Sequence, residues 1–438
     1  MISKIFTPRI VAGSAGLALL TILLLLPFSS AWAGKRVNLD ITSAEFKKIP
    51  VAVPYFVDSN RPNEIQQAGQ ELAMLASKAL DFHGFIKTIS PTSYGGRQDA
   101  DWANVGADFV VTVQYAGSAD NVVMEMRLTD VLEGKMILGL KYTFPWNKRK
   151  QMVLKFCDAI IEKLTGIPGV CDTKIAFVSD KTGQKEIFLV DIFGDSVRQV
   201  TRHKFLAVSP RFSPDNKKLA YTSYHRGNAN LYITELSQDK TTQAFSRRSG
   251  LNMAPAWTPN GDSLVVTLSK DGNPDLYQLS TDGSVVRRLT TNAGLNVAPC
   301  FSPDGSKLAF VSDRTGEPQV YIMDYKSGTV NRITYQGNEN TTPAWSPDGK
   351  WIAYTGKDDG RYQLFKISPE GGQPVQLTSS AGDHEAPSWS PDSRLIVFSR
   401  AVNSQKKLYV ISQNGKDMRQ LYSFEGNQTT PQWSNRMN

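Results

Sequence analysis

The chain has 438 residues, with 49 Lys and Arg against 41 Asp and Glu and a formal net charge of +8. This basic excess is modest for the length, and no long block of Lys and Arg of the kind that tracks phosphates is present. Composition therefore argues against nucleic acid as a partner.

Residues 1–33 have the three parts of a secretory signal. A start with two basic residues precedes a leucine-rich apolar run over 11–27, and Ala31-Trp32-Ala33 is a small-x-small cleavage site before Gly34. A membrane anchor is the alternative, but the run is shorter than the ~20 residues that a spanning helix needs. We predict cleavage and export, with no later membrane span. The mature chain, having lost two basic residues and no acid, has a charge of +6.

Residues 34–168 are predicted to form a small α/β domain. Apolar residues recur at intervals of three and four from Ile65 to Ala79 and again from Met152 to Leu164, as on amphipathic helices. Glycines 84 and 166 mark the ends of these helices. Strands are expected at residues 51–53, 107–115, 122–128 and 136–143. Two helices would then pack on one sheet.

Three cysteines occur in the chain. Cys157 lies in the second predicted helix and Cys171 follows shortly after, so the two form a candidate disulfide in an oxidising compartment. The sequence equally allows two separately buried thiols, because connectivity cannot be read from spacing. Cys300 occupies a strand position that small residues fill in its sister repeats, which predicts a core position.

Residues 169–438 contain a repeat whose motif is a proline, any residue, an aromatic residue and Ser or Thr. The prolines of the six copies are Pro210, Pro255, Pro299, Pro343, Pro387 and Pro431, so the first spacing is 45 residues and the other four are 44. A period of 40 to 45 residues is the length of one four-stranded propeller blade.

Each repeat predicts four strands and no helix. In one copy, the motif is followed by the tight turn Ser302-Pro303-Asp304-Gly305, then by short apolar strands at 308–312 and 319–324 and a fourth strand ending in Ile333-Thr334. Tryptophans at the aromatic position are predicted to pack between blades: Trp257, Trp345, Trp389 and Trp433.

The two ends of the repeat region complete each other. The unit that begins at Ile175 lacks a Pro-x-aromatic strand, whereas Pro431–Ser434 is such a strand alone. Joining them gives a sixth blade and hides the strand edges that an open array would expose. We therefore predict a mainly β fold: a six-bladed β-propeller over 169–438, closed by the C-terminal strand and preceded by the α/β domain.

Motifs for catalysis and cofactor binding are missing. The sequence has no G-x-S-x-G elbow, no glycine-rich phosphate loop and no H-E-x-x-H pattern. The histidines fall in separate elements, at His83, His203, His225 and His384. The aspartates that recur in the repeats, Asp304, Asp348 and Asp392, are predicted to be turn residues. We predict no enzyme activity, no metal and no cofactor.

A binding face is predicted at the loops that precede each first strand, because these open on the same side as the loops between second and third strands. Three residues before the motif prolines stand Asn252, Asn296, Asn340, His384 and Gln428. A ring of amide and imidazole groups around a channel suits recognition of a polypeptide, or of a trapped ion or water. The alternative is that these side chains only satisfy loop backbone groups. The second set of loops carries a charged rim of Arg226, Lys270, Asp271, Arg314, Lys357, Asp358 and Arg361.

The chain resembles the TolB family, the soluble periplasmic components of the Tol-Pal envelope system. The resemblance covers the mature sequence and rests on the signal peptide, the α/β domain, the joining phrase 162–167 and the repeats, with Pro-Ala-Trp-Ser-Pro-Asp-Gly over 343–349. It implies a non-enzymatic monomer that links an inner-membrane TolA-like protein with a peptidoglycan-associated lipoprotein, and so serves outer-membrane integrity and cell division.

The resemblance also implies two partner sites. The lipoprotein would dock on the propeller loops at Asn252, Ala254, Asn296, Ala298, Asn340, Thr342, His384 and Ala386. The TolA-like partner would bind an N-terminal arm that consists of Lys35, Arg36, Val37, Asn38, Leu39, Asp40 and Ile41. The alternation of Val37, Leu39 and Ile41 suits addition of a strand to a partner's sheet, or else a first strand of the chain's own small domain.

Two other functions stay open. A glycan-binding propeller would need exposed aromatic residues on the loop face, where Tyr224 and Tyr335 are the main candidates. A lyase or hydrolase at the channel mouth would need converging acids, histidines or a metal.

Overall fold

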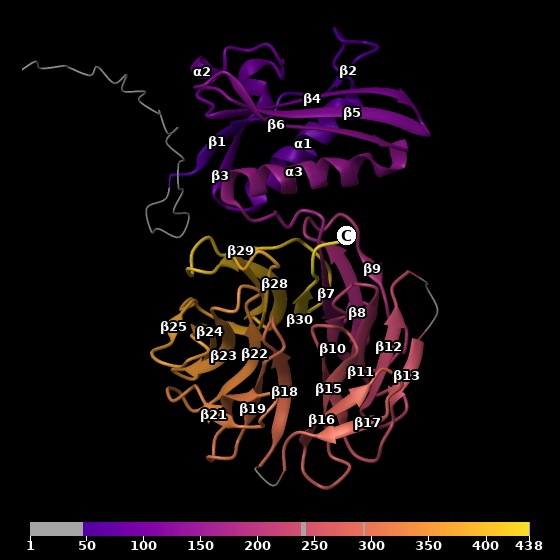
Figure 1. Ribbon diagram of the computed structural model, residues 1–438, viewed down its shortest axis with the longest axis vertical. Coiled ribbons are helices and arrows are strands. Elements are labelled where there is room, and N and C mark those ends of the chain that lie inside the picture. Colours follow the sequence, from indigo (N-terminus) through magenta and orange to yellow (C-terminus); the bar gives the residue numbers. More distant parts are fainter. Residues whose placement is uncertain (1–46, 238–241, 292–293, 438) are drawn as a thin grey trace, which may run out of the picture. The chain divides into compact units, whose positions relative to one another are not determined.

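The computed structural model describes residues 47–237, 242–291 and 294–437 (Figure 1). The predicted signal at 1–33 and the predicted arm at 35–41 lie outside the described residues. Within the described ranges, no helix has the length and apolar character needed to cross a membrane.

The first part of the described chain is an α/β domain with one sheet, in the order β3-β1-β4-β5-β6 and with β2 beside β4. Its strands are β1 (Ile49–Ala52), β2 (Val57–Asp58), β3 (Ile86–Ile89), β4 (Phe109–Ser118), β5 (Asn121–Asp130) and β6 (Lys135–Phe144). Strand β1 is parallel to β3 and β4, whereas β4, β5 and β6 form an antiparallel meander. The predicted strands are therefore present, and β2 and β3 are additions that their short sequences did not reveal.

Helices α1 (Gln67–Phe82) and α3 (Arg149–Thr165) pack against each other and contact β3 and β6, respectively (Figure 1). Both helices were predicted. Helix α3 ends where Gly166 takes a left-handed conformation, with φ of 77°, and donates its N–H to the Glu162 carbonyl at 2.7 Å. The short helix α2 (Trp102–Val105) begins at Asp101, whose side chain accepts from the Asn104 N–H.

The rest of the described chain forms six four-stranded antiparallel sheets, which we number as blades I to VI. Blade I combines β30 (Gln428–Trp433) with β7 (Lys174–Ser179), β8 (Glu186–Asp191) and β9 (Arg198–Gln199). Blade II has β10 (Ala207–Phe212), β11 (Lys218–Ser223), β12 (Asn230–Glu235) and β13 (Thr242–Ser246). Blade III has β14 (Asn252–Trp257), β15 (Ser263–Leu268), β16 (Asp275–Ser280) and β17 (Val285–Arg288).

Blade IV has β18 (Asn296–Phe301), β19 (Lys307–Ser312), β20 (Gln319–Asp324) and β21 (Val330–Arg332). Blade V has β22 (Asn340–Trp345), β23 (Ile352–Asp358), β24 (Arg361–Ile367) and β25 (Val375–Gln376). Blade VI has β26 (Asp383–Trp389), β27 (Leu395–Val402), β28 (Gln405–Ser412) and β29 (Arg419–Gln420). The prediction of six blades is confirmed.

The ring closes as predicted, by pairing of the last strand with the first propeller strand. Strand β30 is antiparallel to β7, with Gln428 opposite Ser179 and Trp433 opposite Ile175. The first strands β10, β14, β18, β22, β26 and β30 contact one another in turn around the ring, and β30 contacts β10. These six strands therefore surround the propeller axis.

Motif residues hold neighbouring blades together. The indole N–H of Trp257 donates to the Arg211 carbonyl at 3.2 Å, and that of Trp389 donates to the Ala344 carbonyl at 2.9 Å, each in the preceding blade. The turn aspartates behave as predicted: Asp304 accepts from Ser302 Oγ and from the Ser306 N–H. These hydrogen bonds lower the pKa of Asp304 to about 2.

Candidate functional site

Two sets of loops lie at the same end of the blades and form what we call the loop face. In blade III, Asn252 at the start of the first strand pairs with Leu268 at the end of the second. The two loops are also hydrogen-bonded, since the Leu251 N–H donates to Ser269 Oγ at 2.8 Å and the Ser269 N–H donates to the Leu251 carbonyl at 3.1 Å. The topology that we expected from the sequence therefore places both sets of loops together.

The predicted ring of amides and imidazole is buried beneath this face. Asn252, Asn296, His384 and Gln428 have no exposed surface and Asn340 is 2% exposed. Each side chain makes hydrogen bonds within the propeller; Asn252 Nδ2, for example, donates to the carbonyls of Ala229 and Arg248. These five predicted partner-binding or ring side chains are thus buried and hydrogen-bonded within the propeller.

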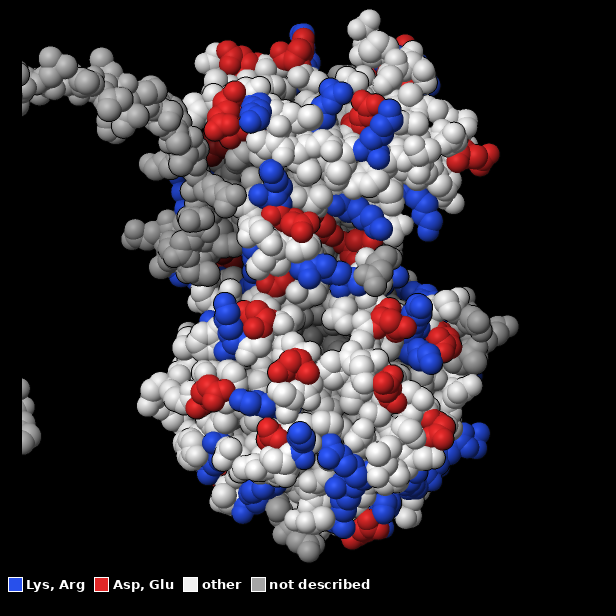
Figure 2. Space-filling view, viewed as in Figure 1, with Lys and Arg blue, Asp and Glu red and all other residues white. Residues whose placement is uncertain are grey.

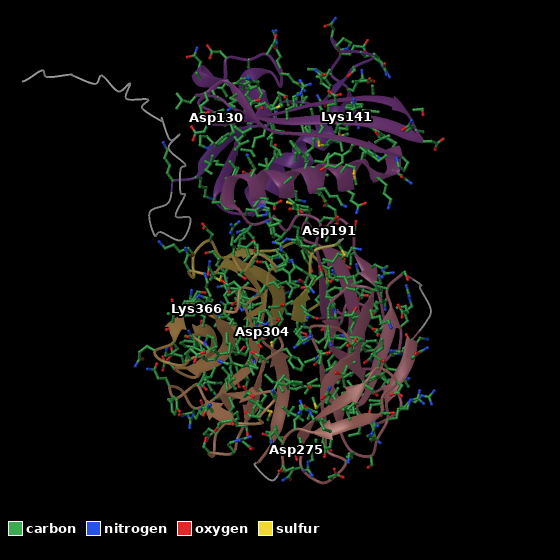
Figure 3. All side chains as sticks on the ribbon, in the orientation of Figure 1. Asp130, Lys141, Asp191, Asp275, Asp304 and Lys366 are labelled. Atoms are coloured by element: carbon green, nitrogen blue, oxygen red, sulfur yellow. The ribbon has the colours of Figure 1, made fainter. Side chains whose placement is uncertain are left out.

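The same three-residue arrangement holds the ring at two blade junctions. Asp275, labelled in Figure 3, begins β16 and accepts from Thr290 Oγ1 at 2.6 Å and from Asn296 Nδ2 at 3.0 Å. At the next junction, Gln319 Oε1 accepts from Thr334 Oγ1 and from Asn340 Nδ2, both at 2.8 Å. We call this arrangement the junction latch. It ties the third and fourth strands of one blade to the first strand of the next.

Asp275 is a buried carboxylate with a cationic partner. Its Oδ2 accepts from Arg288 Nη2 at 2.5 Å, while Asn296 Oδ1 accepts from Arg314 Nη2 at 2.9 Å. The latch at Asp275 therefore contains a carboxylate, whereas the latch at Gln319 is built from neutral groups.

The residues just before the motif prolines reach the surface. Ser209, Ala254, Ala298, Thr342, Ala386 and Thr430 all have φ between 44° and 56°. The register shifts at these positions, as in a β-bulge. The bulge N–H is bound by the preceding blade: Ala386 N–H donates to Thr355 Oγ1 at 3.0 Å and Ala254 N–H to Thr222 Oγ1 at 3.3 Å.

Of the eight propeller residues predicted for partner binding, four are thus accessible. Thr342 is exposed, and Ala254, Ala298 and Ala386 are partly exposed. A left-handed backbone is unfavourable for residues with a Cβ, and such strain often lies at functional sites. Because it recurs at all six first strands, we attribute it to the blade architecture.

Exposed side chains of the loop face were only partly foreseen. Phe205 precedes β10 and is 55% exposed, and Tyr335 precedes β22 and is 72% exposed. Arg332 lies over the Tyr335 ring, 4.8 Å from its centroid. Sequence reasoning named Tyr335 but missed Phe205, which follows His203 and Lys204 in the loop before β10. On the side of the molecule that Figure 2 shows, basic and acidic side chains are interspersed.

A pair of histidines stacks near the loop face in blade II. The rings of His203 and His225 are parallel, with centroids 4.4 Å apart and an interplanar angle of 6°. His203 Nε2 lies 2.9 Å from Tyr221 Oη, and His225 Nε2 lies 3.4 Å from Tyr232 Oη. Burial lowers the pKa of both imidazoles, so they are neutral at pH 7. Among the residues that the structure describes, the ring nitrogens contact hydroxyl groups and no carboxylate, an arrangement that lacks the orienting acid of a catalytic triad.

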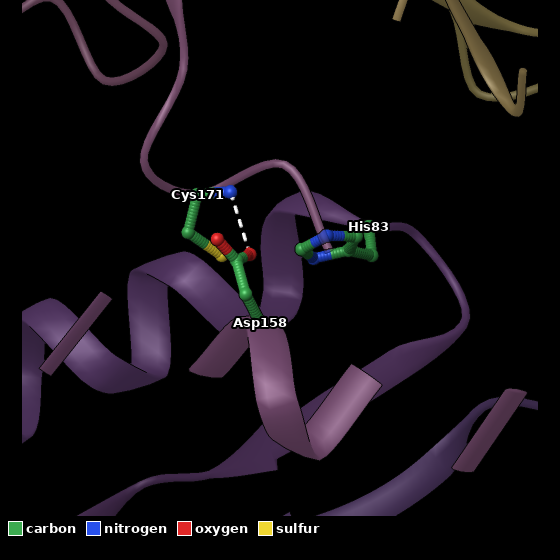
Figure 4. A group of neighbouring side chains, drawn as sticks. All are labelled: His83, Asp158 and Cys171. Carbon is green, nitrogen blue, oxygen red and sulfur yellow. Dashed lines mark hydrogen bonds between the residues drawn. The ribbon is translucent and has the colours of Figure 1, made fainter. Parts of the chain in front are cut away.

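Figure 4 shows the group that most nearly approaches a metal site in the described chain: His83, Asp158 and Cys171, whose ligand atoms lie within 4.8 Å of one another. These atoms already have partners. His83 Nδ1 is 3.1 Å from the Ala79 carbonyl, and His83 Nε2 accepts from the Val170 N–H at 3.3 Å. Asp158 accepts from the Cys171 N–H at 2.7 Å. The group anchors the segment after α3.

Both cysteines of the candidate disulfide are free, buried thiols in the structure, the second of the two alternatives. Cys157 Sγ and Cys171 Sγ contact the carbonyls of Ala76 and Ala79, one turn apart on α1, at 3.8 and 3.7 Å. Burial raises the pKa of both thiols. A neutral thiol is a poor metal ligand and a poor nucleophile.

Two family models match the chain. The TolB amino-terminal domain matches residues 37–137 and the TolB beta propeller domain matches residues 161–437. A Tol-Pal system protein TolB from Desulfotalea psychrophila is 44% identical over 271 residues, which are 61% of this chain and 62% of the relative. One from Desulfosudis oleivorans is 37% identical over 261 residues, 57% of this chain and 59% of that relative. The chain thus matches less than two thirds of the length of these relatives.

A solved structure covers more of the chain. The crystal structure of TolB from Acinetobacter baumannii superposes with a TM-score of 0.79 at 28% identity, over 89% of this chain and 97% of that one. The likeness extends over the small α/β domain and the propeller together.

Proposed function

The chain belongs to the TolB family, and from this membership we propose that it is a non-enzymatic protein-binding component of the periplasmic Tol-Pal system. It acts as a monomer that links a TolA-like inner-membrane protein with a peptidoglycan-associated lipoprotein. Through this link it serves outer-membrane integrity and constriction at cell division. The observation that carries the proposal is the loop face, which combines exposed aromatic rings with a charged rim.

We place the lipoprotein on the loop face. Large exposed aromatic residues dominate the binding energy of protein interfaces, and surrounding charges set specificity and association rate. Phe205 and Tyr335 supply the rings. Lys270 with Asp271, joined at 2.6 Å, belongs to the rim. The accessible bulge residues Ala254, Ala298, Thr342 and Ala386 complete the surface, whereas the buried residues of the junction latch support it from below.

The lipoprotein site is tested by calorimetry with the periplasmic domain of the organism's own peptidoglycan-associated lipoprotein. The double variant Phe205→Ala, Tyr335→Ala is expected to bind about tenfold or more weakly, because truncation of central aromatic residues removes the largest single contributions. Leu132→Ala is the matched control, since Leu132 is 96% exposed but lies in the turn between β5 and β6. Equal losses of affinity in both variants, or no loss in the double variant, would mean that the lipoprotein binds elsewhere than at the loop face. Absence of binding by the folded wild type would reject the proposed partner.

We assign the TolA-like partner to the N-terminal arm, whose alternating apolar residues suit strand addition. Replacing Val37, Leu39 and Ile41 together by Ser is expected to weaken binding to the TolA-like domain by tenfold or more, on the order of one lost hot spot. Asn38→Ser changes the opposite side of the predicted strand and is expected to leave binding unchanged. Calorimetry with the lipoprotein serves as a second control, because its affinity should be the same in all three proteins. Unaltered TolA-like binding by the triple variant would refute the assignment.

The proposal that the protein is not an enzyme rests on the chemistry of its polar clusters. The stacked pair His203 and His225 is bonded to hydroxyl groups, and the group at His83 is occupied by backbone partners. Neither cluster combines a nucleophile with an oriented base.

A further inference from the structure

A second ring of side chains lies around the propeller axis, at the residue between the proline and the aromatic of each motif. Around the ring these residues are Arg211, Ala256, Cys300, Ala344, Ser388 and Gln432. The first strand of every blade is covered on its outer side by the second strand. Arg211, Cys300, Ser388 and Gln432 nevertheless keep partial solvent exposure. Their exposed surface therefore faces the axis, and we call the space that they line the axial channel.

The polar side chains at this level have their acceptor atoms already engaged by the next blade. Gln432 Oε1 accepts from the Phe212 N–H at 2.7 Å, and Ser388 Oγ accepts from the Trp433 N–H at 3.0 Å. Cys300 Sγ likewise accepts from the Trp345 N–H at 3.3 Å. What Gln432 and Ser388 can still offer to the channel is a donor, an amide N–H and a hydroxyl, whereas the Cys300 thiol already contacts the Phe301 carbonyl at 3.8 Å.

Arg211 adds a permanent cation to this set of donors. Among the described residues the Arg211 guanidinium takes part in no salt bridge, and its one hydrogen bond runs from Nη1 to the carbonyl of Pro210 at 2.9 Å. Burial raises the pKa of the Cys300 thiol and lowers the pKa of the Arg211 guanidinium, and the two groups, two blades apart, are close enough for each to oppose part of the other's shift. A guanidinium in a confined site without a counter-charge is unfavourable.

Three consecutive first strands, β26, β30 and β10, thus supply Ser388, Gln432 and Arg211, while Ala256 and Ala344 leave room beside them. We propose that this level of the axial channel binds a carboxylate, with the Arg211 guanidinium as its main contact and Gln432 Nε2 and Ser388 Oγ as further donors. The fork of a guanidinium matches the two oxygens of a carboxylate. This site is separate from the loop-face residues proposed for the lipoprotein and does not depend on that partner.

Cys300 gives the site a built-in reporter, because it lies near Arg211 and can be alkylated. Iodoacetate and iodoacetamide react alike: the thiolate sulfur attacks the methylene carbon, an S–C bond forms and iodide leaves. They differ in that only iodoacetate carries a carboxylate. The effect of Arg211 on the thiol pKa acts equally on both reagents, so the ratio of their rates at Cys300 isolates recruitment of the carboxylate.

The ratio of the two rates, measured by mass spectrometry of the Cys300 peptide in folded protein, is expected to fall about tenfold in Arg211→Met. Arg211→Lys, which keeps the charge without the fork, should give an intermediate ratio. The thiols of Cys157 and Cys171 are buried, so neither reagent should label their peptides in any variant, which shows that the variants stay folded during the reaction. An equal ratio in wild type and Arg211→Met, or a Cys300 that neither reagent reaches in the folded wild type, would overturn the proposal.

Competition in the wild type distinguishes the two sources of a carboxylate and does not depend on a variant that folds. Sodium acetate stands for a free small anion, and triglycine for a peptide end, with triglycine amide as its match without a carboxylate at constant ionic strength. Slowing of iodoacetate labelling by triglycine at a lower concentration than acetate would indicate an inserted peptide. Slowing by acetate alone would indicate a small anion, and slowing by neither would contradict the site.

Discussion

Replacing Asn296 by Asp is expected to destabilise the propeller by about 3 kcal/mol or more. The Asn296 side chain has no exposed surface, and its Nδ2 donates to the carboxylate of Asp275, which is equally buried. An aspartate at this position would place two carboxylates in contact and remove the donor that one of them needs. Urea unfolding at pH 7 measures the loss.

Asn228→Asp is the matched control for this prediction. Asn228 is exposed in the loop between β11 and β12, so the same change of charge should alter stability by less than about 0.5 kcal/mol. If Asn296→Asp unfolded at the same urea concentration as Asn228→Asp, the junction latch would have no structural role. Asn296 would then return as a candidate contact for the lipoprotein.

The prediction also changes how the partner site should be mapped. A variant of Asn252 or Asn296 that loses lipoprotein binding would do so because the loop face is deformed, whatever residues the partner touches. Exposed side chains such as Phe205 and Tyr335 avoid this difficulty. The buried polar ring and the exposed rim are different parts of the same face, and only the second can report on contact.

The architecture was predictable because its physical signals are local and repeated. A spacing of 44 residues, a turn after each Pro-x-aromatic strand and an unmatched strand at each end of the repeat suffice for six blades and their closure. The helices followed from apolar periodicity and terminal glycines. Strand β3 escaped prediction because four residues give too short a pattern, and its place in the sheet depends on parallel pairing with β1.

The role of the ring residues was harder to predict because a sequence does not show the direction of a side chain. The partners of Asn296 and Asn340 are Asp275 and Gln319, each 21 residues earlier in the chain. In each case a polar residue stands 21 residues before the asparagine, and a threonine lies between the two in the sequence. This pattern occurs in two successive blades and could have indicated a structural latch. The accessibility of the bulge residues, in contrast, depends on a left-handed backbone, which the residue types at these positions do not predict.

The wild-type protein is expected to lose stability on mild acidification through one histidine of this ring. His384 stands where other blades have asparagine, has no exposed surface and leaves Nδ1 without a hydrogen-bond partner among the described residues. Burial, helped by Arg400, lowers the pKa of His384 from 6.5 to about 4. The unfolded chain therefore takes up the proton first, so the stability that the neutral ring provides above pH 6.5 is lost as the pH falls toward 4.

His384→Asn, which introduces the residue found at the sister positions Asn296 and Asn340, is expected to remove this pH-dependent loss of stability. Between pH 7 and pH 4.5 the free energy of unfolding should fall by about 2 to 3 kcal/mol more in wild type than in the variant. Ser380→Ala, which deletes the hydroxyl 3.3 Å from His384 Nε2 but keeps the imidazole, should retain the wild-type pH dependence. Other acid-sensitive groups act equally in all three proteins, so the difference belongs to this ring position. Parallel pH profiles for wild type and His384→Asn would mean that the imidazole takes up its proton within the folded propeller, which requires a junction open enough to hydrate it.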